Sequence, residues 1–209
     1  MTDEITLSKG ERTRQSIEDA AYALFLEQGY SATSMRQIAE RAGIALGGIY
    51  NHFASKDEIF QALVLAKHPY AQILPVLRDA PGEQVDEFII NAARIIQAEL
   101  GNRPDFIKLM LIEVVEFGGK HFPRLFETVF PLIAPLLERF THPGSGVRPI
   151  PLPLILRTLM GTVVSFYLTG FLMSDPVLPG AMREARLEDF MEIYLHGILE
   201  AKSQGAEPS

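Results

Sequence analysis

Apolar residues recur at helical spacing along most of the chain, in segments that glycine and proline separate. The first segment predicts a helix that begins near Arg12 and stops at Gly29, a residue type that often follows the last turn of a helix. One face of this helix carries Ile17, Ala20, Ala21, Leu24 and Phe25. Such a face is typical of a helix packed against a core.

A second and a third helix are predicted directly afterwards. Thr33 or Ser34 can cap the second helix, because Gln37 follows Ser34 by three residues as in a capping box. Gly43 ends this helix, and a short third helix is expected at Leu46–His52. The region is therefore read as three helices in close succession.

A fourth helix, capped by Ser55, is expected to run toward Leu77, with Asp57 and Glu58 in the first turn, where the helix dipole favours acids. No alternating strand pattern is present in the rest of the sequence. Proline and glycine divide it into helix-length apolar segments, roughly Gly82–Leu100, Pro104–Phe117, Pro123–Phe140, Pro153–Met173 and Glu184–Lys202. The predicted fold class is all-α.

Composition narrows the class of protein. With 209 residues and 47% hydrophobic content, the chain can build a sizeable core. The absence of cysteine excludes disulfide bonds and thiolate metal sites, and it fits the cytoplasmic location that we expect. The formal net charge of −7 argues against a protein that coats nucleic acid through many phosphate contacts. Any contact with nucleic acid must be local.

Membrane insertion and secretion are not expected. The first ten residues are polar and lack the apolar stretch of a secretory signal. Ile150–Met173 is apolar, but Arg157 leaves about sixteen uncharged residues, short of the ~20 that a spanning helix needs. We interpret it as a buried helix. A lipid-binding helical protein remains an alternative, and solubility without detergent would count against it.

Residues Met35–Ala54 have the spacing of a helix-turn-helix. Ala39 is small where the two helices would cross, and Gly43 stands at the turn, where positive φ would strain other residues. The seam between the helices is formed by Ile38, Ile44 and Ile49. Such a motif binds DNA in many proteins, although the same spacing also occurs in helices that only pack together.

The sequence around this motif resembles the tetracycline-repressor (TetR) family. The family pattern is Thr-Ser/Thr-x-Arg-x-Ile-Ala, then Ala-Gly-Val-Ser-x-Gly-x-Leu-Tyr-x-His-Phe, then a Ser-Lys-Glu type of start to the fourth helix. Thr33–Ala39, Ala42–Phe53 and Ser55–Asp57 match these three parts, and the resemblance runs from about Arg12 to Leu63. It implies a ligand-responsive, DNA-binding transcriptional regulator without enzymatic activity or cofactor.

The resemblance also implies a domain organisation. A disordered tail at residues 1–10 would precede a helix-turn-helix DNA-binding domain at 11–54. A helical domain for effector binding and dimerisation would follow at 55–202, with a disordered tail at 203–209. The expected partners are a palindromic operator in double-stranded DNA, an unknown small-molecule effector and a second copy of the chain. Half-sites would lie about one DNA turn, or ~34 Å, apart.

Roles in DNA binding follow residue by residue from the resemblance. Contacts to phosphate are expected from Thr33, Ser34, Arg36, Tyr50, His52 and Lys56. Base reading falls to the segment Ala45–Asn51, in which Ala45 and Leu46 offer apolar contact, for example to thymine methyl groups, and Asn51 suits adenine. Gly47 and Gly48 let the backbone approach DNA.

This segment departs from the family pattern at the start of the third helix. Ala45 and Leu46 stand where many relatives carry Ser or Thr and then a polar or basic residue, so the usual cap is missing. Gly47 and Gly48 each lower helix stability by roughly 0.8–1 kcal/mol against alanine. The third helix is therefore expected to be weakly stable by itself.

The dimer interface is expected on the last two long helices. The final segment carries an apolar stripe, Leu187, Phe190, Met191, Tyr194, Leu195, Ile198 and Leu199. The segment before it has small residues that permit close packing, Gly161, Ser165, Thr169 and Gly170. Together they could form a four-helix bundle across a two-fold axis. The alternative is that the stripe packs within its own chain.

Candidates for the effector site combine acids, aromatic rings and hydrogen-bonding groups, namely Glu113, Glu116, Phe117, His121, Arg157, Phe166 and Tyr167. Glu113 lies on an apolar helix face, so as an ion it needs a partner. The two acids could attract a cationic effector, or they could pair with Arg103, Arg157 or Lys108, or face water. Arg157 could neutralise Glu113 or anchor an acidic ligand, and each aromatic residue could simply be core.

Effector binding is expected to separate or tilt the DNA-binding domains so that DNA is released, with the fourth helix as the lever. The competing enzyme class would be a di-metal helical bundle. Such a site needs paired Glu-x-x-His units, and no histidine in the chain stands three residues after a glutamate. No metal site is therefore predicted.

Overall fold

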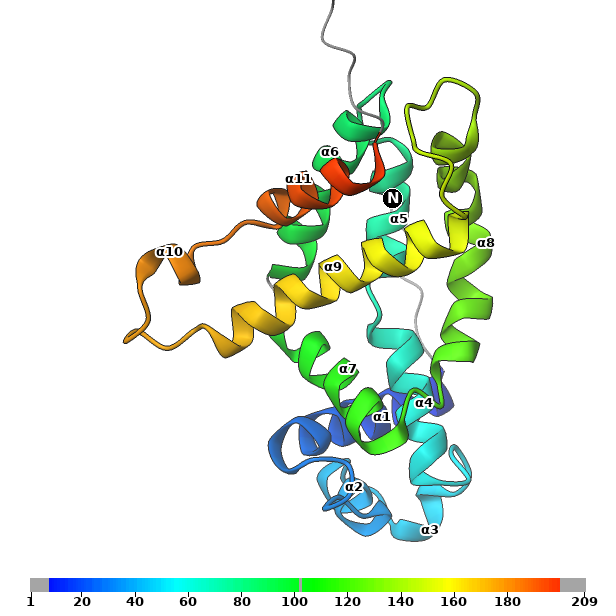
Figure 1. The fold of residues 1–209 in the computed structure, drawn as a ribbon. Coiled ribbons are helices and arrows are strands. Elements are labelled where there is room, and N and C mark those ends of the chain that lie inside the picture. The colour runs from blue at the N-terminus through cyan, green and yellow to red at the C-terminus, as the bar shows by residue number, and fades with distance from the viewer. Residues whose placement is uncertain (1–7, 102, 200–209) are drawn as a thin grey trace, which may run out of the picture. The chain divides into compact units, whose positions relative to one another are not determined.

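The computed structural model describes residues 8–101 and 103–199. Across these residues every extended regular element is a helix (Figure 1). The β-type pairing found there is one isolated antiparallel bridge between Val147 and Leu199. The prediction of an all-α fold is confirmed.

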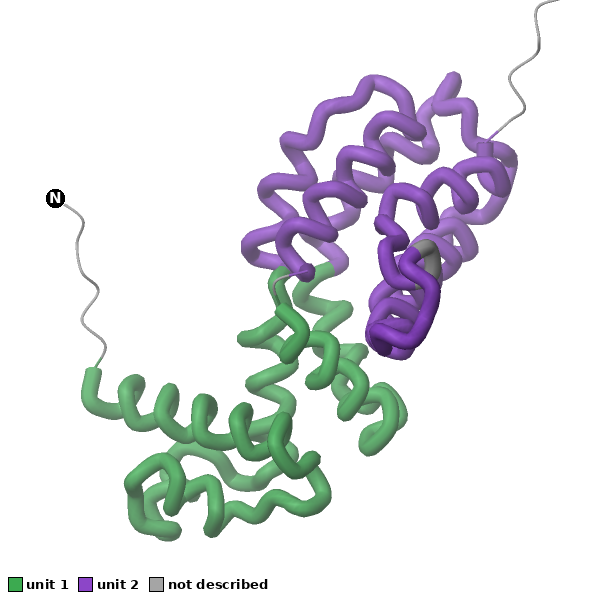
Figure 2. The backbone as a smooth tube through the Cα atoms, turned by 90° about the vertical axis from the view of Figure 1, so that its left-hand side faces the viewer, with its two compact units in different colours: residues 1–69, 103–129 green, residues 70–102, 130–209 purple. Residues whose placement is uncertain are grey.

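The chain forms two compact units, which Figure 2 distinguishes. The first, called the head, comprises residues 1–69 and 103–129. It contains α1 (Lys9–Gln28), α2 (Met35–Arg41), α3 (Leu46–Ile49), α4 (Lys56–Lys67), α7 (Pro104–Phe117) and the first turns of α8 (Phe122–Thr141). The predicted domain boundary after residue 54 falls inside the head.

The second unit, called the body, comprises residues 70–102 and 130–209. It contains α5 (Tyr70–Arg78), α6 (Val85–Gly101), the rest of α8, α9 (Leu152–Leu172), α10 (Gly180–Arg183) and α11 (Leu187–Ile198). Within the body, α11 packs against both α6 and α9.

The first helix begins three residues earlier than predicted. Ser8 caps α1 because its Oγ accepts a hydrogen bond from the Glu11 backbone N–H at 3.2 Å, and the Ser8 N–H donates to Glu11 Oε2 at 2.7 Å. The expectation of a disordered tail was therefore wrong for residues 8–10. The remaining tail residues, 1–7 and 203–209, lie outside the described part of the chain.

Two helices end earlier than predicted. The fourth helix stops at Lys67 instead of running toward Leu77, because Pro69 has no N–H and favours the extended conformation observed at His68 (φ −66°, ψ 125°). The third helix has only four residues, Leu46–Ile49, instead of reaching His52. Its glycine content and missing cap account for the short length.

The two cores are separate sets of apolar side chains. The head core includes the fully buried Ile17, Phe25, Ile38, Ile49, Phe53, Phe60 and Leu63. In the body, the apolar stripe of α11 supplies much of the core through Leu187, Met191, Tyr194, Leu195 and Ile198. This stripe therefore packs within its own chain, and its expected role as a dimer surface was wrong.

The interpretation of the apolar segment at Ile150–Met173 as a buried helix was also wrong. It forms α9, in which Ile155 is the one residue assigned to the core, and only 6% of its most apolar 18-residue stretch is buried. The helix is long and apolar enough to cross a membrane by length and composition. The core helices of soluble proteins pass the same test of length and composition, so the test alone does not make α9 a membrane-spanning helix.

Candidate nucleic-acid interface

The helix-turn-helix is formed by α2, the turn at residues 42–45 and α3. Ser34 caps α2 as predicted, since its Oγ accepts from the Gln37 N–H at 3.2 Å and Gln37 Oε1 accepts from the Ser34 N–H at 2.8 Å. Gly43 has φ 71°, the left-handed conformation that glycine allows. Beneath the turn, Ile38 and Ile49 are fully buried. The motif is thus held by both its caps and its core.

The outer face of the motif is open to solvent. Ala45 begins α3 without a side-chain cap, as predicted. Leu46 is 42% exposed and Tyr50 is 53% exposed, although both are large apolar or aromatic side chains. Ser34, Arg36, Ala45, Gly47 and Asn51 are exposed as well, whereas Gly48 and His52 are half-buried. The exposed residues lie on α2, on α3 and in the segments directly next to them.

Two residues predicted to contact phosphate, Thr33 and Lys56, form hydrogen bonds within the head. Thr33 is 2% exposed, and its Oγ1 donates to the Gly29 carbonyl at 2.8 Å and accepts from Gln28 Nε2 at 3.1 Å. Lys56 Nζ donates to the carbonyl oxygens of Tyr30 and Thr33 at 2.6 and 2.5 Å. Their polar groups therefore fix the link between α1 and α2.

The ammonium group of Lys56 also lies 4.0 Å from the centre of the Tyr30 ring. Burial lowers the pKa of Lys56, although the nearby Glu116 carboxylate acts in the opposite direction. A phosphate contact of Lys56 was predicted from its position in the family motif. That position gives no information about the backbone carbonyl groups around the side chain.

Sequence reasoning missed Arg14 in α1. Its guanidinium lies 4.0 Å from the Phe53 ring centre and donates to the His52 carbonyl at 3.2 Å. Arg14 thereby connects the first helix to the segment just after α3. No local motif surrounds Arg14 in the sequence, so only the fold reveals this contact.

The end of α7 is attached to the head by hydrogen bonds. The Glu116 carboxylate accepts from the backbone N–H groups of Tyr30 and Ser31 at 3.0 and 2.8 Å, and from the Ser31 hydroxyl. These two residues belong to the link between α1 and α2, which also contacts Lys56. Glu116 and Lys56 therefore hold the same short segment from two sides.

A buried acid and a buried histidine join α7 to α8. Glu113 is 0% exposed and His121 is 2% exposed. Glu113 Oε1 accepts from the His121 backbone N–H, and Glu113 Oε2 contacts His121 Nδ1, both at 2.7 Å. Glu113 pairs with none of the partners considered from the sequence, Arg103, Arg157 or Lys108, because both of its carboxylate oxygens contact His121.

The start of α4 joins the same group of charges. Asp57 Oδ1 lies 2.5 Å from Lys120 Nζ and 3.5 Å from His121 Nε2. Although partial burial of Asp57 works in the opposite direction, hydrogen bonding and attraction to Lys120 and His121 hold the pKa of this carboxyl below its usual value. The chain thus ties α4, α7 and α8 together within the head.

Comparison with known proteins matches this part of the chain. Residues 17–63 match the family described as bacterial regulatory proteins, tetR family. The HTH-type transcriptional regulator SrpR of Pseudomonas putida is 43% identical over 65 residues, which cover 31% of this chain and 30% of SrpR. The chain is therefore similar to tetR-family regulators over this region. Its aligned part spans less than a third of the length of SrpR.

Solved structures extend the likeness in fold. Salmonella enterica GusR superposes with a TM-score of 0.69 at 19% identity, covering 92% of this chain and 98% of GusR. A TetR family transcription regulator from Marinobacter aquaeolei VT8 gives a TM-score of 0.61 at 14% identity, covering 91% of this chain and 97% of its own. The tetR-type fold therefore covers the body as well as the head.

The seven candidate effector residues divide between the two units. Glu113, Glu116, Phe117 and His121 belong to the head, and Arg157, Phe166 and Tyr167 belong to the body. The Phe117 ring packs 4.4 and 4.5 Å from the ring centres of Tyr30 and Phe60. The four head residues contact one another, the α1–α2 link or α4, and their place in an effector pocket stays a prediction.

The three candidates in the body lie on α9. Arg157 is exposed, and the Phe166 ring packs 5.1 Å from Tyr167 and 5.4 Å from Phe190. The Tyr167 hydroxyl donates to the Ile96 carbonyl at 3.2 Å, and burial raises its pKa to about 12. Tyr167 therefore stays protonated and joins α9 to α6.

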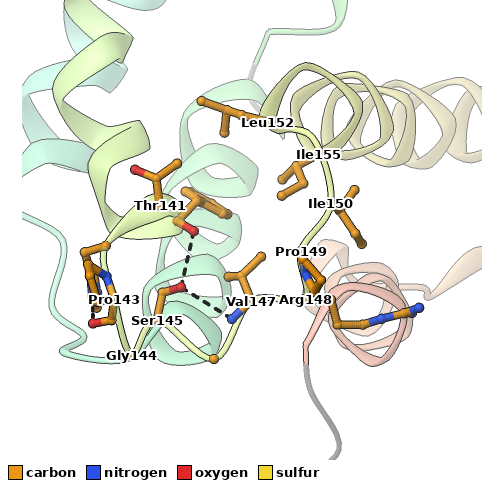
Figure 3. Close-up of a pocket in the computed structure, with 13 residues that line it drawn as sticks. Thr141, Pro143, Gly144, Ser145, Val147, Arg148, Pro149, Ile150, Leu152 and Ile155 are labelled. Atoms are coloured by element: carbon orange, nitrogen blue, oxygen red, sulfur yellow. Dashed lines mark hydrogen bonds between the residues drawn. The ribbon is translucent and has the colours of Figure 1, made fainter.

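The body also has a hollow that sequence reasoning missed. It measures about 420 Å³ and is formed by the α8–α9 loop together with Phe140, Leu152 and Ile155 (Figure 3). The Ser145 hydroxyl donates to the Phe140 carbonyl at 3.3 Å and accepts from the Val147 N–H at 3.4 Å, which fixes the loop. None of the seven candidate residues lines this hollow.

The described residues contain no candidate metal-binding site. Across 8–101 and 103–199, no three or more His, Cys, Asp or Glu side chains are grouped so that they could hold a metal ion. The Glu113–His121 pair is instead occupied by its own hydrogen bonds.

Proposed function

We propose that the protein is a transcriptional repressor that binds operator DNA through the exposed face of α2 and α3. The observation that carries this proposal is the open surface around Leu46 and Tyr50 on a helix-turn-helix whose interior is closed. An exposed patch of large apolar and aromatic side chains often marks a binding site. The match of residues 17–63 to the tetR family supports the same function.

The proposed contacts divide into two kinds. Ser34, Arg36 and Tyr50 are exposed and hold phosphates, which sets the position of the head on the duplex. Ala45, Leu46 and Asn51 face base edges, and Gly47 allows the backbone to come close. Thr33 and Lys56 contribute indirectly, by fixing the segment that leads into α2.

We propose that the operator is palindromic because two copies of the chain bind it. Large apolar side chains are exposed along α9, namely Leu154, Met160, Val164, Leu168, Phe171 and Leu172. On α11, whose apolar stripe is internal, Ile193 is 76% exposed. Outer faces of these two helices supply the proposed two-fold interface, which would hide surface that water solvates poorly.

A small molecule is proposed to bind the body and to lower the affinity of the dimer for DNA. The body has the aromatic group around Phe166 and the hollow at the α8–α9 loop, whose volume lies in the range of small-molecule sites. Release requires that the ligand bind the DNA-free conformation more tightly. The protein would act in the cytoplasm without enzymatic activity or cofactor.

The test is a binding assay at several salt concentrations, with the full-length protein and duplexes from upstream of its own coding sequence. We expect selective binding that Tyr50→Ala weakens at least tenfold, because an exposed side chain at the interface is lost. Val115→Ala is the matched control, since Val115 is 78% exposed on α7, outside α2 and α3. Equal affinity for operator and unrelated duplexes would reject the function.

A further inference from the structure

The third helix depends on contacts outside itself. It is a single turn, Leu46–Ile49, with two glycines in it and no side-chain hydrogen bond that caps its start. A helix of this length has no stability of its own in water. Just after it, the Ile49 carbonyl accepts hydrogen bonds from the N–H groups of His52 and Phe53, both at 3.0 Å. Whatever holds His52 and Phe53 therefore also holds the end of α3.

Arg14 of α1 contacts both of these residues. Its guanidinium carbon lies 4.0 Å from the centre of the Phe53 ring, and its Nη1 donates to the His52 carbonyl at 3.2 Å. Its Nε lies 3.2 Å from Oε1 of Glu18, one turn further along α1, and the Glu18 side chain is only 13% exposed. Because the guanidinium is planar and rigid, contacts at two of its nitrogens and on one face fix its orientation. Arg14 is therefore in place before any DNA is bound.

The contact to His52 acts on the backbone that carries two proposed DNA contacts. The Phe53 ring is fully buried and anchors one side chain, whereas the bond to the His52 carbonyl restrains rotation of the peptide itself. Tyr50 and Asn51 occupy the two positions between the end of α3 and His52, and both are exposed. A rotation of this peptide would change the direction of their side chains.

A phosphate contact is the other role that an arginine at this place can have. The side chain of Arg14 is 44% exposed, so solvent reaches part of it. Its contacts to Glu18, His52 and Phe53 nevertheless use Nε, Nη1 and one face of the guanidinium. The Glu18 carboxylate beside it would also repel a phosphate. The geometry therefore favours the internal role.

We propose that Arg14 is a positioning residue for operator recognition, because it holds the segment after α3 in the orientation in which Tyr50 and Asn51 meet the DNA. The inference rests on the proposed DNA-binding function and deepens it with a residue of α1 that lies outside the family match at residues 17–63. Contacts to bases require a fixed geometry, whereas binding to unrelated duplexes depends mainly on phosphate charge. Loss of Arg14 should therefore reduce selectivity for the operator.

The experiment measures the ratio of two affinities. A duplex is selected from a random-sequence library with the full-length protein, and binding to it and to an unrelated duplex is measured at several salt concentrations. In Arg14→Met we expect this ratio to fall at least about fivefold, the effect of losing one cation–π contact and one hydrogen bond. A smaller folded fraction would lower both affinities equally, so the ratio does not report stability.

Two further variants separate position from charge. Arg12→Met is the matched control, because it removes the same charge from α1 at an exposed residue on a different face of the helix. In this control the ratio should stay within about twofold of that of the unmodified protein. Arg14→Lys keeps the charge but loses the planar fork, so it should lower the ratio as Arg14→Met does.

An unchanged ratio in Arg14→Met would overturn the inference while leaving the DNA-binding function intact. Equal weakening on both duplexes, with a salt dependence reduced by about one phosphate contact and recovery in Arg14→Lys, would identify a phosphate contact and also overturn it. A fall of the ratio in Arg12→Met as large as in Arg14→Met would assign the effect to charge and overturn it as well. Failure to select any sequence would instead reject the proposed function on which the inference stands.

Discussion

The end of α7 in the head and the long helix α9 in the body are both rich in apolar residues, but only the end of α7 is also held by polar bonds to its own unit. Around α7, Glu113 binds His121, Glu116 binds the α1–α2 link, and Phe117 packs on two other rings. Along α9, side chains such as Val164 and Phe171 remain more than half exposed. Directional polar bonds fix the end of α7 although Val114 and Val115 there are exposed, whereas α9 carries a longer row of exposed apolar side chains that a partner can cover.

The largest expected effect comes from a substitution in the body, on the exposed face of α9. Val164→Glu places a carboxylate in the proposed interface, where burial of an unpaired charge is costly. Because a two-fold dimer carries the substitution twice, we expect its dissociation constant to rise by about 10⁴-fold or more, as measured by sedimentation of the full-length protein. Val177→Glu is the control, because Val177 is already 90% exposed in the loop after α9. Unchanged association of Val164→Glu would exclude this face.

The next effect is in the head. Glu113→Ala leaves the buried His121 ring without its carboxylate partner, and we expect a loss of about 3–5 kcal/mol in the free energy of unfolding. Urea denaturation measures this loss. Glu127→Ala, which removes a carboxylate that is 68% exposed, should cost almost nothing. Replacing both partners, Glu113→Leu with His121→Leu, should restore part of the stability.

Most of the local structure of the head could be predicted from its sequence, because the signals are adjacent in the chain. The caps at Ser34 and Ser55 and the turn at Gly43 depend on residues within a few positions. The partners of Glu116 and Lys56 lie 85 and 26 residues away, at Ser31 and Tyr30. Single-sequence patterns do not contain such distant pairings.

The same limit explains the two apolar helices of the body. Helical periodicity in α11 and general hydrophobicity in α9 both predict burial. They do not tell whether the covering surface comes from the same chain or from another molecule. In this fold Leu195 of α11 meets its own chain, while Val164 of α9 stays uncovered.

A third prediction concerns acid stability of the head. Burial lowers the pKa of His68, at the end of α4, to about 4. An unfolded chain binds this proton near pH 6.5, so the stabilisation by neutral His68 is complete above pH 6.5 and is lost as the pH falls toward 4. The loss should reach up to about 3 kcal/mol in the free energy of unfolding.

Urea denaturation at pH 7 and pH 4.5 tests this dependence by comparison of variants. His68→Leu should weaken less than the unmodified protein over this interval, because the titrating group is removed. His142→Leu should behave like the unmodified protein, since His142 is exposed in the α8–α9 loop of the body. Parallel pH profiles for all three proteins would contradict the assignment.

The smallest expected effect concerns the hydrogen bonds by which Glu116 attaches α7 to the α1–α2 link. Glu116→Gln places a neutral amide beside the N–H groups of Tyr30 and Ser31, so charge-assisted hydrogen bonds become ordinary ones. We expect a loss of about 1 kcal/mol in the free energy of unfolding, read from urea denaturation with Glu127→Gln as the matched control. An effect of the same size in both variants would mean that the bonds of Glu116 do not matter for the head.

The return of residues 103–129 to the head has a consequence for anyone who recombines regulators. A graft cut after residue 54 or 69 would transfer α1–α3, or α1–α4, without α7. In the transferred segment, Tyr30 and Phe60 would lose the ring of Phe117 that packs on them, and Asp57 would lose its ion pair with Lys120. A functional transplant therefore has to be discontinuous in sequence, because the exchangeable module is a pair of segments, residues 1–69 and 103–129.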